Sequence, residues 1–152
     1  YRPFDKAYVV YDEKVVTRPR KKVMQHLLPG ENWGLITVRQ VAEGIFTHVL
    51  VSNLPADLRT TLSNKGGSYF FPLYLYPDKI DEFINGNSNG NGKHKELPRQ
   101  PNFSDAFIQV LETRLHWQLI PEGHGDLEKT ISALDVFHYM YAVFHSPTYR
   151  QL

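Results

Sequence analysis

Lysine and arginine side chains gather in the first part of the 152-residue chain, where they could bind a polyanion. Residues 1–65 contain ten Lys or Arg and six Asp or Glu, a net charge of +4, whereas residues 66–152 contain seven and ten, a net charge of −3. Between residues 14 and 41 a single acid, Glu31, stands against six cations: Lys14, Arg18, Arg20, Lys21, Lys22 and Arg39. This clustering indicates either a polyanion contact or a solvated helix face.

Two residues at the end of an apolar run, Arg39 and Gln40, have side chains that can read bases. An Arg can bind O6 and N7 of guanine together, and a Gln can bind N7 and N6 of adenine. Because neighbouring residues of a strand point to opposite faces, at most one of the two would reach a base from a regular sheet. Arg59 and Lys65 belong to polar loops and could reach phosphates.

Patterns that would indicate catalysis are absent from the sequence. Without cysteine there are no disulfides, thiolate zinc ligands or cysteine nucleophiles. No two of the seven histidines have the i, i+4 spacing of a helical metal site, and there is no Gly-x-Ser-x-Gly elbow or phosphate-binding loop. Asp12-Glu13-Lys14 has the Asp-x-Lys pattern of metal-dependent nucleases, but its nearest partner acid, Asp5, lies only seven residues upstream. We therefore predict no catalytic residue, metal site or cofactor in this chain.

The first half of the chain is expected to be rich in strands. β-branched and aromatic residues predict strands at 7–12, 33–40, 45–52 and 68–76. The link at 41–44 has the length of a hairpin turn, so the two strands that it joins should pair antiparallel. Pro72 has no amide hydrogen to donate, which places the last of these strands at a sheet edge or a bulge.

A helix is expected between the first two strands. Thr17 is a suitable N-cap and Pro19 suits a first turn, while Pro29-Gly30 would end the helix. An apolar stripe at helical spacing predicts the buried face: Val23, Met24, Leu27 and Leu28. Arg18, Lys21, Lys22 and Gln25 would then occupy the outer face.

The second half of the chain is expected to be helical. Residues 85–101 are rich in Asn and Gly and predict a flexible loop between a β-rich front, 1–84, and a helical rear, 102–152. Ser104 would cap a first helix with an apolar stripe of Phe107, Val110, Leu111 and Leu115. A second helix is predicted over 134–145, with Phe137, Met140, Tyr141 and Phe144 facing inward and Ser146-Pro147 at its end.

These elements predict a single α+β domain: a small, curved, mainly antiparallel sheet with helices packed on it. No apolar run approaches the roughly 20 residues that span a bilayer, so we expect a cytoplasmic protein without membrane contact. The chain opens on Tyr1 rather than on Met, which we interpret as a fragment of a larger polypeptide.

Short blocks along the chain point to a known family. In order they are Tyr1-Arg2-Pro3-Phe4-Asp5, Arg18-Pro19-Arg20, Asn32-Trp33-Gly34-Leu35-Ile36 with Arg39-Gln40, Gly66-Gly67-Ser68-Tyr69 with Pro72-Leu73-Tyr74-Leu75-Tyr76-Pro77, Asn102-Phe103, and Tyr139 to Arg150. This succession resembles the C-terminal specificity, or target recognition, region of bacterial type ISP restriction-modification enzymes and related adenine-specific DNA methyltransferases. The resemblance covers nearly the whole chain.

The resemblance implies a parent polypeptide with a nuclease, often a helicase-like motor, and an amino-methyltransferase that uses S-adenosylmethionine. The methyltransferase motif Asn/Asp-Pro-Pro-Tyr/Phe, its cofactor glycine motif and the motor motifs are missing from this sequence. The chain would therefore recognise a sequence in double-stranded DNA on behalf of the methyltransferase and nuclease domains of its parent, and would not be an enzyme by itself.

Under this interpretation we predict phosphate contacts from Arg18, Arg20, Lys21, Lys22, Arg59 and Lys65, and base reading by Arg39 and Gln40. One alternative is an interaction or spacer module that docks other domains of the same enzyme and does not bind DNA. Another is a small metal-dependent hydrolase. Basic residues on one concave face would favour DNA binding, scattered ones the spacer, and a pocket of histidines and carboxylates the hydrolase.

Overall fold

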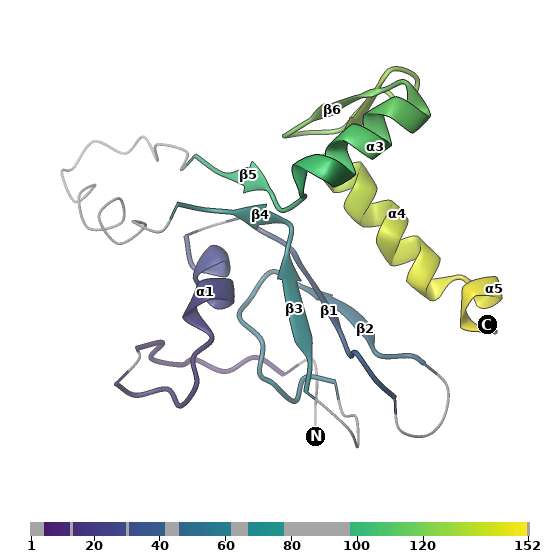
Figure 1. The fold of residues 1–152 in the computed structure, drawn as a ribbon. Helices are drawn as coiled ribbons and strands as arrows, with labels where there is room; N and C mark the ends of the chain where they lie inside the picture. The colour runs from purple at the N-terminus through teal and green to yellow at the C-terminus, as the bar shows by residue number, and fades with distance from the viewer. Residues whose placement is uncertain are drawn as a thin grey trace. The chain divides into compact units, whose positions relative to one another are not determined.

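The computed structural model describes residues 5–12, 14–29, 31–41, 46–61, 67–77 and 98–151. The chain divides into two compact units, unit 1 (Tyr1–Phe71) and unit 2 (Pro72–Leu152). Helices and strands occur in both units, which confirms the predicted α+β class (Figure 1). The boundary falls within the predicted β-rich front and not at the Asn/Gly-rich loop, so organisation as one domain stays a prediction.

Unit 1 is built on a three-stranded sheet. β1 (Gly34–Thr37) is the central strand, between β2 (Val49–Ser52) and β3 (Tyr69–Pro72). β1 and β2 run antiparallel, so the predicted pairing is confirmed, although both strands are shorter than predicted. β3 lies at an edge of the sheet, as Pro72 predicted, because a proline nitrogen cannot donate to a neighbouring strand.

The helix that precedes the sheet is also shorter than predicted. α1 spans Lys21–Met24 and continues as a 3-10 turn, η1, over Gln25–Leu27. Its N-cap is Arg20, not Thr17 as predicted. Arg18 and Arg20 both have left-handed backbones, with φ of 56° and 51°, and a right-handed helix cannot continue through such residues.

The core of unit 1 lies between this short helix and one face of the sheet. Met24 and Leu27, two of the predicted stripe residues, pack with Ile36 of β1 and Phe70 of β3 in a buried cluster. Leu28, also predicted to be buried, is 48% exposed because it follows η1 rather than continuing a regular helix.

Asn32 fastens the end of η1 to the start of β1. Its side-chain amide donates to the carbonyl oxygen of His26 at 2.7 Å, and its side-chain oxygen accepts from the backbone N–H of Trp33 at 2.9 Å. Asn32 is only 2% exposed, so both ends of its amide need such partners. These hydrogen bonds tie η1 to the residue that precedes β1.

Residues 7–12 do not form the predicted strand. The backbone there has no strand pairing, and Tyr8, Val9 and Val10 are exposed. A high strand propensity describes side chains that fit a pleated surface, and it cannot hold a strand for which the described chain offers no neighbour.

Unit 2 begins where the predicted strand 68–76 is broken. β4 (Tyr74–Leu75) follows β3 after one residue, Leu73, and pairs antiparallel with β5 (Gln100–Pro101). Asn102 secures this corner, because its N–H donates to the carbonyl of Leu73 at 2.8 Å and its amide to the carbonyl of Pro72 at 2.9 Å. β5 lies within the range predicted as loop, 85–101, of which 85–97 fall outside the described residues.

Two longer helices follow, as predicted. α3 spans Asp105–Leu115 and α4 spans Ala133–His145. Ser104 caps α3 by accepting from the N–H of Phe107 at 3.3 Å. Ser146 ends α4, and a short helix, α5 (Pro147–Arg150), starts there. No residue of α3 is buried, whereas α4 buries Ala133, Val136 and Phe137. Of the predicted inward residues of α4, Phe137 is therefore confirmed, while Met140 is 38% exposed.

Two short strands between these helices were not predicted. β6 (Gln118–Ile120) and β7 (Thr130–Ser132) pair in parallel. With three residues each, they are too short to show an alternating pattern. Pairing is antiparallel for β1 with β2 and β4 with β5, so the predicted mainly antiparallel character is confirmed, spread over three small sheets. None of the described helices is long and apolar enough to cross a bilayer.

Candidate nucleic-acid interface

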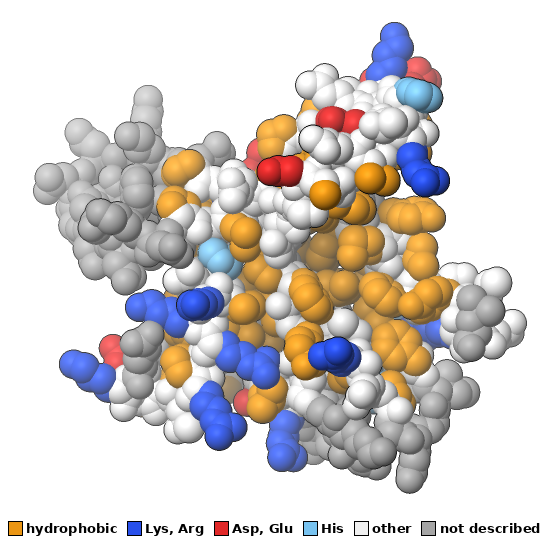
Figure 2. Space-filling model, in the orientation of Figure 1, with side chains coloured by type: hydrophobic (Ala, Val, Ile, Leu, Met, Phe, Trp, Pro, Cys, Tyr) orange, Lys and Arg blue, Asp and Glu red, His pale blue; other side chains and the backbone are white. Residues whose placement is uncertain are grey.

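Four of the predicted phosphate-binding residues form one stretch of unit 1. Arg18 and Arg20 precede α1, and Lys21 and Lys22 are its first two residues. All four residues are exposed. Figure 2 shows Lys and Arg side chains gathered over α1 and the segment that leads to it. We call residues 18–22 the basic segment.

The backbone of the basic segment is strained. Arg18 and Arg20, on either side of Pro19, both have positive φ. A left-handed backbone costs a residue other than glycine about 1–2 kcal/mol, and a following proline restricts Arg18 further. Such conformations persist only where the surrounding structure imposes them, and they cluster at functional sites.

The side chain of Arg20 supplies part of that constraint. Its Nη1 donates to the carbonyl oxygen of Ser68, just before β3, at 2.8 Å. Its own carbonyl accepts from the N–H groups of Val23 and Met24, which starts α1. Although the sequence predicted a phosphate contact, the structure gives Arg20 a bond within the domain. No motif indicated this, because the partner is 48 residues away.

Arg59 lies on a second polar segment, the turn at residues 57–61. Its N–H donates to Asp57 Oδ1 at 2.7 Å, and its side chain is exposed. The carbonyl of Leu58 accepts from the N–H of Ser68 at 2.7 Å. This turn is therefore bound to the same residue as Arg20. Lys65, the remaining predicted phosphate contact, lies outside the described residues.

The two predicted base-reading residues follow β1. β1 ends at Thr37, and both Arg39 and Gln40 are exposed beyond it. The sequence predicted that at most one of the two could read a base, because neighbours on a strand point to opposite faces. Since both residues lie beyond the strand, that restriction does not apply to them. Their exposure leaves both side chains accessible to a large ligand.

In unit 2, Arg99 contacts Glu122 and Tyr74 in a partly buried cluster that the sequence did not predict. Arg99 donates from Nε and Nη2 to the two carboxylate oxygens of Glu122, both at 2.7 Å, and its Cζ lies 4.1 Å from the ring centre of Tyr74. The hydrogen bonds to Glu122 raise the pKa of Arg99. Burial, with the nearby Glu122 charge, raises the pKa of Tyr74.

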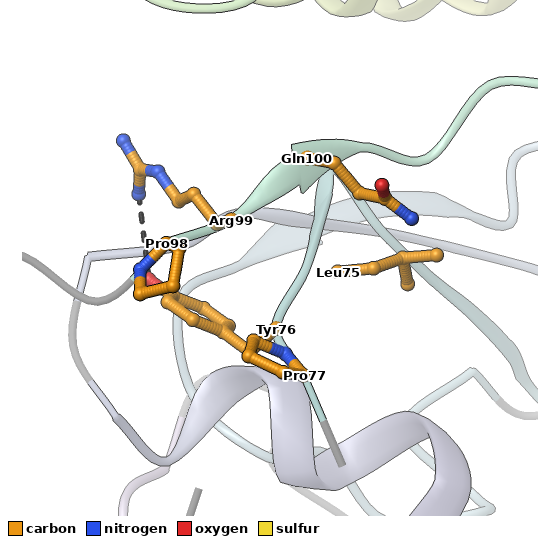
Figure 3. Close-up of a pocket in the computed structure, with 6 residues that line it drawn as sticks. All are labelled: Leu75, Tyr76, Pro77, Pro98, Arg99 and Gln100. Carbon is orange, nitrogen blue, oxygen red and sulfur yellow. Dashed lines mark hydrogen bonds between the residues drawn. The ribbon is translucent and has the colours of Figure 1, made fainter. Parts of the chain in front are cut away.

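A pocket of about 310 Å³ adjoins this cluster (Figure 3). It is lined by Leu75, Tyr76, Pro77, Pro98, Arg99 and Gln100. The Arg99 guanidinium contacts the hydroxyl of Tyr76 at 3.5 Å. Because this guanidinium is already neutralised by Glu122, the pocket offers little charge to a ligand, and none of the predicted site residues lies in it.

Unit 2 contains a serine, an aspartate and a histidine close together. Ser132, Asp135 and His124 lie together, but the Ser132 hydroxyl and His124 Nδ1 both contact the carboxylate of Asp135, at 2.7 and 3.0 Å. A catalytic triad needs the histidine between the other two. Over the part of the chain that the structure describes, no three His, Asp or Glu residues are grouped as a metal ion requires. The described residues therefore contain no arrangement that favours the hydrolase alternative.

The fold and the exposed cations define an α+β domain with a basic surface on unit 1. Comparison with protein families then shows its class: the model of the type ISP C-terminal specificity domain matches residues 1–152. The chain belongs to this family, as its motif blocks indicated. Neither the curated proteins nor the solved structures contain a significant match. A specificity domain of this family points to target recognition in a type ISP restriction enzyme, not to catalysis.

Proposed function

We propose that this chain recognises a sequence in double-stranded DNA. The observation that carries the proposal is the basic segment, whose cations are exposed. Its backbone is strained and is held by the hydrogen bond from Arg20 to Ser68. The chain that contains it belongs to a family of specificity domains. Lys and Arg side chains that neutralise phosphates supply most of the sequence-independent affinity of DNA-binding proteins. Arg18, Lys21, Lys22 and Arg59 have the exposure that this role requires.

Sequence selection is proposed to come from Arg39 and Gln40. Both are exposed at the end of β1, and their side chains can form paired hydrogen bonds with guanine and adenine respectively. A good pair of this kind discriminates against the wrong base by about 1–3 kcal/mol. Phosphate contacts would set the register of the domain on the duplex, and these two residues would read it.

The resemblance supports a wider role within a larger enzyme. We propose that the parent polypeptide carries an adenine-specific DNA methyltransferase, with S-adenosylmethionine as its cofactor, and a restriction nuclease. The present chain would supply the target choice for both activities. The methyltransferase chemistry and its cofactor would then belong to the parent's other domains.

The experiment is a DNA-binding titration over a range of salt concentrations. Lys21→Ala/Lys22→Ala should weaken binding to any duplex by about tenfold per lost contact near 0.1 M salt, because each phosphate contact contributes about 0.9 to the slope of log K against log salt. The slope should fall by the same amount per contact. Fluorescence anisotropy with a random-sequence duplex measures both quantities.

Lys129→Ala is the control for a single lost lysine charge, because Lys129 is an exposed residue of unit 2. It should leave affinity and slope nearly unchanged. If Lys21→Ala/Lys22→Ala behaves like this control, the basic segment does not bind DNA, and the interaction or spacer module becomes the better description.

A further inference from the structure

We infer that Ser68 and Arg20 form a joint that holds two segments of unit 1 in one fixed arrangement: the basic segment, residues 18–22, and the turn that carries Arg59, residues 57–61. The inference rests on the proposed DNA-binding function and assigns Arg20 a different role from its neighbours. Arg20 is a positioning residue, whereas Arg18, Lys21, Lys22 and Arg59 contact the phosphates.

One arm of the joint runs from Ser68 to the basic segment. The Ser68 carbonyl accepts from Arg20 Nη1 at 2.8 Å, in a partly buried position. A hydrogen bond from a charged donor is about twice as strong as one between neutral groups. Since Arg20 is the N-cap residue of α1, this bond ties the start of the helix, where Lys21 and Lys22 lie, to Ser68.

The other arm runs from Ser68 to the turn that carries Arg59. The Ser68 N–H donates to the carbonyl of Leu58 at 2.7 Å, and its hydroxyl accepts from the N–H of Thr61 at 2.9 Å. The hydroxyls of Ser68 and Thr61 are 2.7 Å apart and share a further hydrogen bond. The turn is thus held at both ends by one residue.

Burial makes this joint stiff. Ser68 is 3% exposed and Thr61 is 5% exposed, so water cannot replace their hydrogen bonds at little cost. Ser68 also immediately precedes β3, whose Phe70 belongs to the core of unit 1. Ser68 therefore links residues 18–22 and residues 57–61 to the core of unit 1, in addition to the direct packing of Met24 of α1 in the same cluster.

A stiff arrangement of cations favours DNA binding because phosphates lie at fixed spacings along a duplex. Cations that are already in place lose less conformational freedom on binding than cations on independent loops. Removing the joint should therefore reduce the contribution of both segments, including that of Arg59, whose turn is connected to Arg20 through Ser68. An independent phosphate contact at Arg20 would have no such effect on Arg59.

The decisive experiment is a double-mutant cycle between Arg20→Ala and Arg59→Ala, read as affinity and salt slope for the same random duplex. Coupling through the joint predicts that Arg59→Ala costs at least about threefold less affinity in the Arg20→Ala background than in the parent chain. If the affinity losses of Arg20→Ala and Arg59→Ala simply add in the double variant, the two residues are not coupled and the inference is wrong.

An uncharged variant gives a second reading. Thr61→Val removes a hydroxyl of the joint without changing any charge, and it should weaken DNA binding and lower the salt slope. Thr47→Val, at an exposed threonine of unit 1, is the matched control. Circular dichroism checks that Thr61→Val is folded. If it is not, Thr61→Ser, which retains the hydroxyl, should bind DNA like the parent chain. The double-mutant cycle between Arg20→Ala and Arg59→Ala then decides whether the two segments are coupled.

The two proposals fail in different ways. If Lys21→Ala/Lys22→Ala weakens binding while the Arg20 and Arg59 losses simply add, DNA binding stands and the joint is wrong. If none of the cations affects binding, the proposed function itself is wrong, and the positioning role of Arg20 and Ser68 in DNA binding is wrong too.

Discussion

The carboxylate of Asp135 in unit 2 accepts four hydrogen bonds. It accepts from the N–H of Gly125 at 2.7 Å, from the N–H and hydroxyl of Ser132 at 2.9 and 2.7 Å, and from His124 at 3.0 Å. With Ser132 it forms the capping box of α4. Burial opposes its ionisation, but the hydrogen bonds from His124, Gly125 and Ser132 outweigh burial and hold the pKa of Asp135 well below its usual range.

Replacing this carboxylate should therefore have a pH-dependent cost. A group whose pKa is lower in the folded than in the unfolded state stabilises the fold above the unfolded pKa, about 3.9 for Asp, and loses that effect as the pH falls towards the folded pKa. Asp135→Asn should lower the free energy of unfolding by about 1–2 kcal/mol at pH 7. Urea unfolding at pH 7 and at pH 3 measures the difference, which should shrink at pH 3.

Asp105→Asn serves as the control for Asp135→Asn, because Asp105 is an exposed acid in the first turn of α3. It should change stability much less. A loss at Asp135 that is equal at both pH values would show that the asparagine disturbs packing and that the charge is unimportant.

Individual cations were easier to predict than their surroundings. A run of Lys and Arg is visible in the sequence, and Arg18, Lys21 and Lys22 are exposed as expected. Ser68 had no local signal, because a serine after two glycines is ordinary and its partners come from residues 20, 58 and 61. Long-range hydrogen bonds of this kind depend on the completed fold.

At the scale of elements, local patterns predicted the positions of α3 and α4, because the Ser104 cap, the apolar spacing and the Ser146-Pro147 end are local signals. The apolar stripe predicted for α3 is not buried. The strand pair β1–β2 was predicted for the same reason, through its short link. The 7–12 strand was wrong because a strand depends on a neighbour that its own sequence does not specify.

The Phe70 ring of β3 packs directly against Gly34 of β1. A Cβ at Gly34 would lie 1.8 Å from Cε1 of Phe70, whose ring is buried in the cluster with Met24, Leu27 and Ile36. Gly34→Ala should therefore destabilise unit 1 by about 1–3 kcal/mol, as overpacked cores do. Thermal or urea unfolding measures the loss.

The second-site variant Gly34→Ala/Phe70→Leu tests the cause of that loss. Leucine removes the ring atoms that the new methyl group meets, so the double variant should lose less stability than the sum of the two single variants. Additive losses, or a Gly34→Ala protein as stable as the parent, would contradict a clash with Phe70.

At the scale of the whole chain, charge separates along the sequence, with +4 over residues 1–65 and −3 over residues 66–152. In Figure 2 the visible Asp and Glu side chains lie mostly over α3 and β6, within unit 2. We expect duplex DNA to slow amide hydrogen exchange in residues 14–24 and 57–61 of unit 1, with little change in α3. Exchange measured by mass spectrometry, with and without DNA, tests this, and protection centred on α3 would refute it.

The strain in Arg18-Pro19-Arg20 has a consequence for engineering. Glycine adopts a left-handed backbone at no steric cost, so glycine at positions 18 and 20 would relieve strain while removing cations. A library selected only for heat resistance should then enrich glycine at position 18. At position 20 the same change would also remove the hydrogen bond from Arg20 to Ser68. Such a selection would enrich domains with higher thermal stability and weaker affinity for DNA, so selection for stability and selection for DNA binding would favour different residues at position 18.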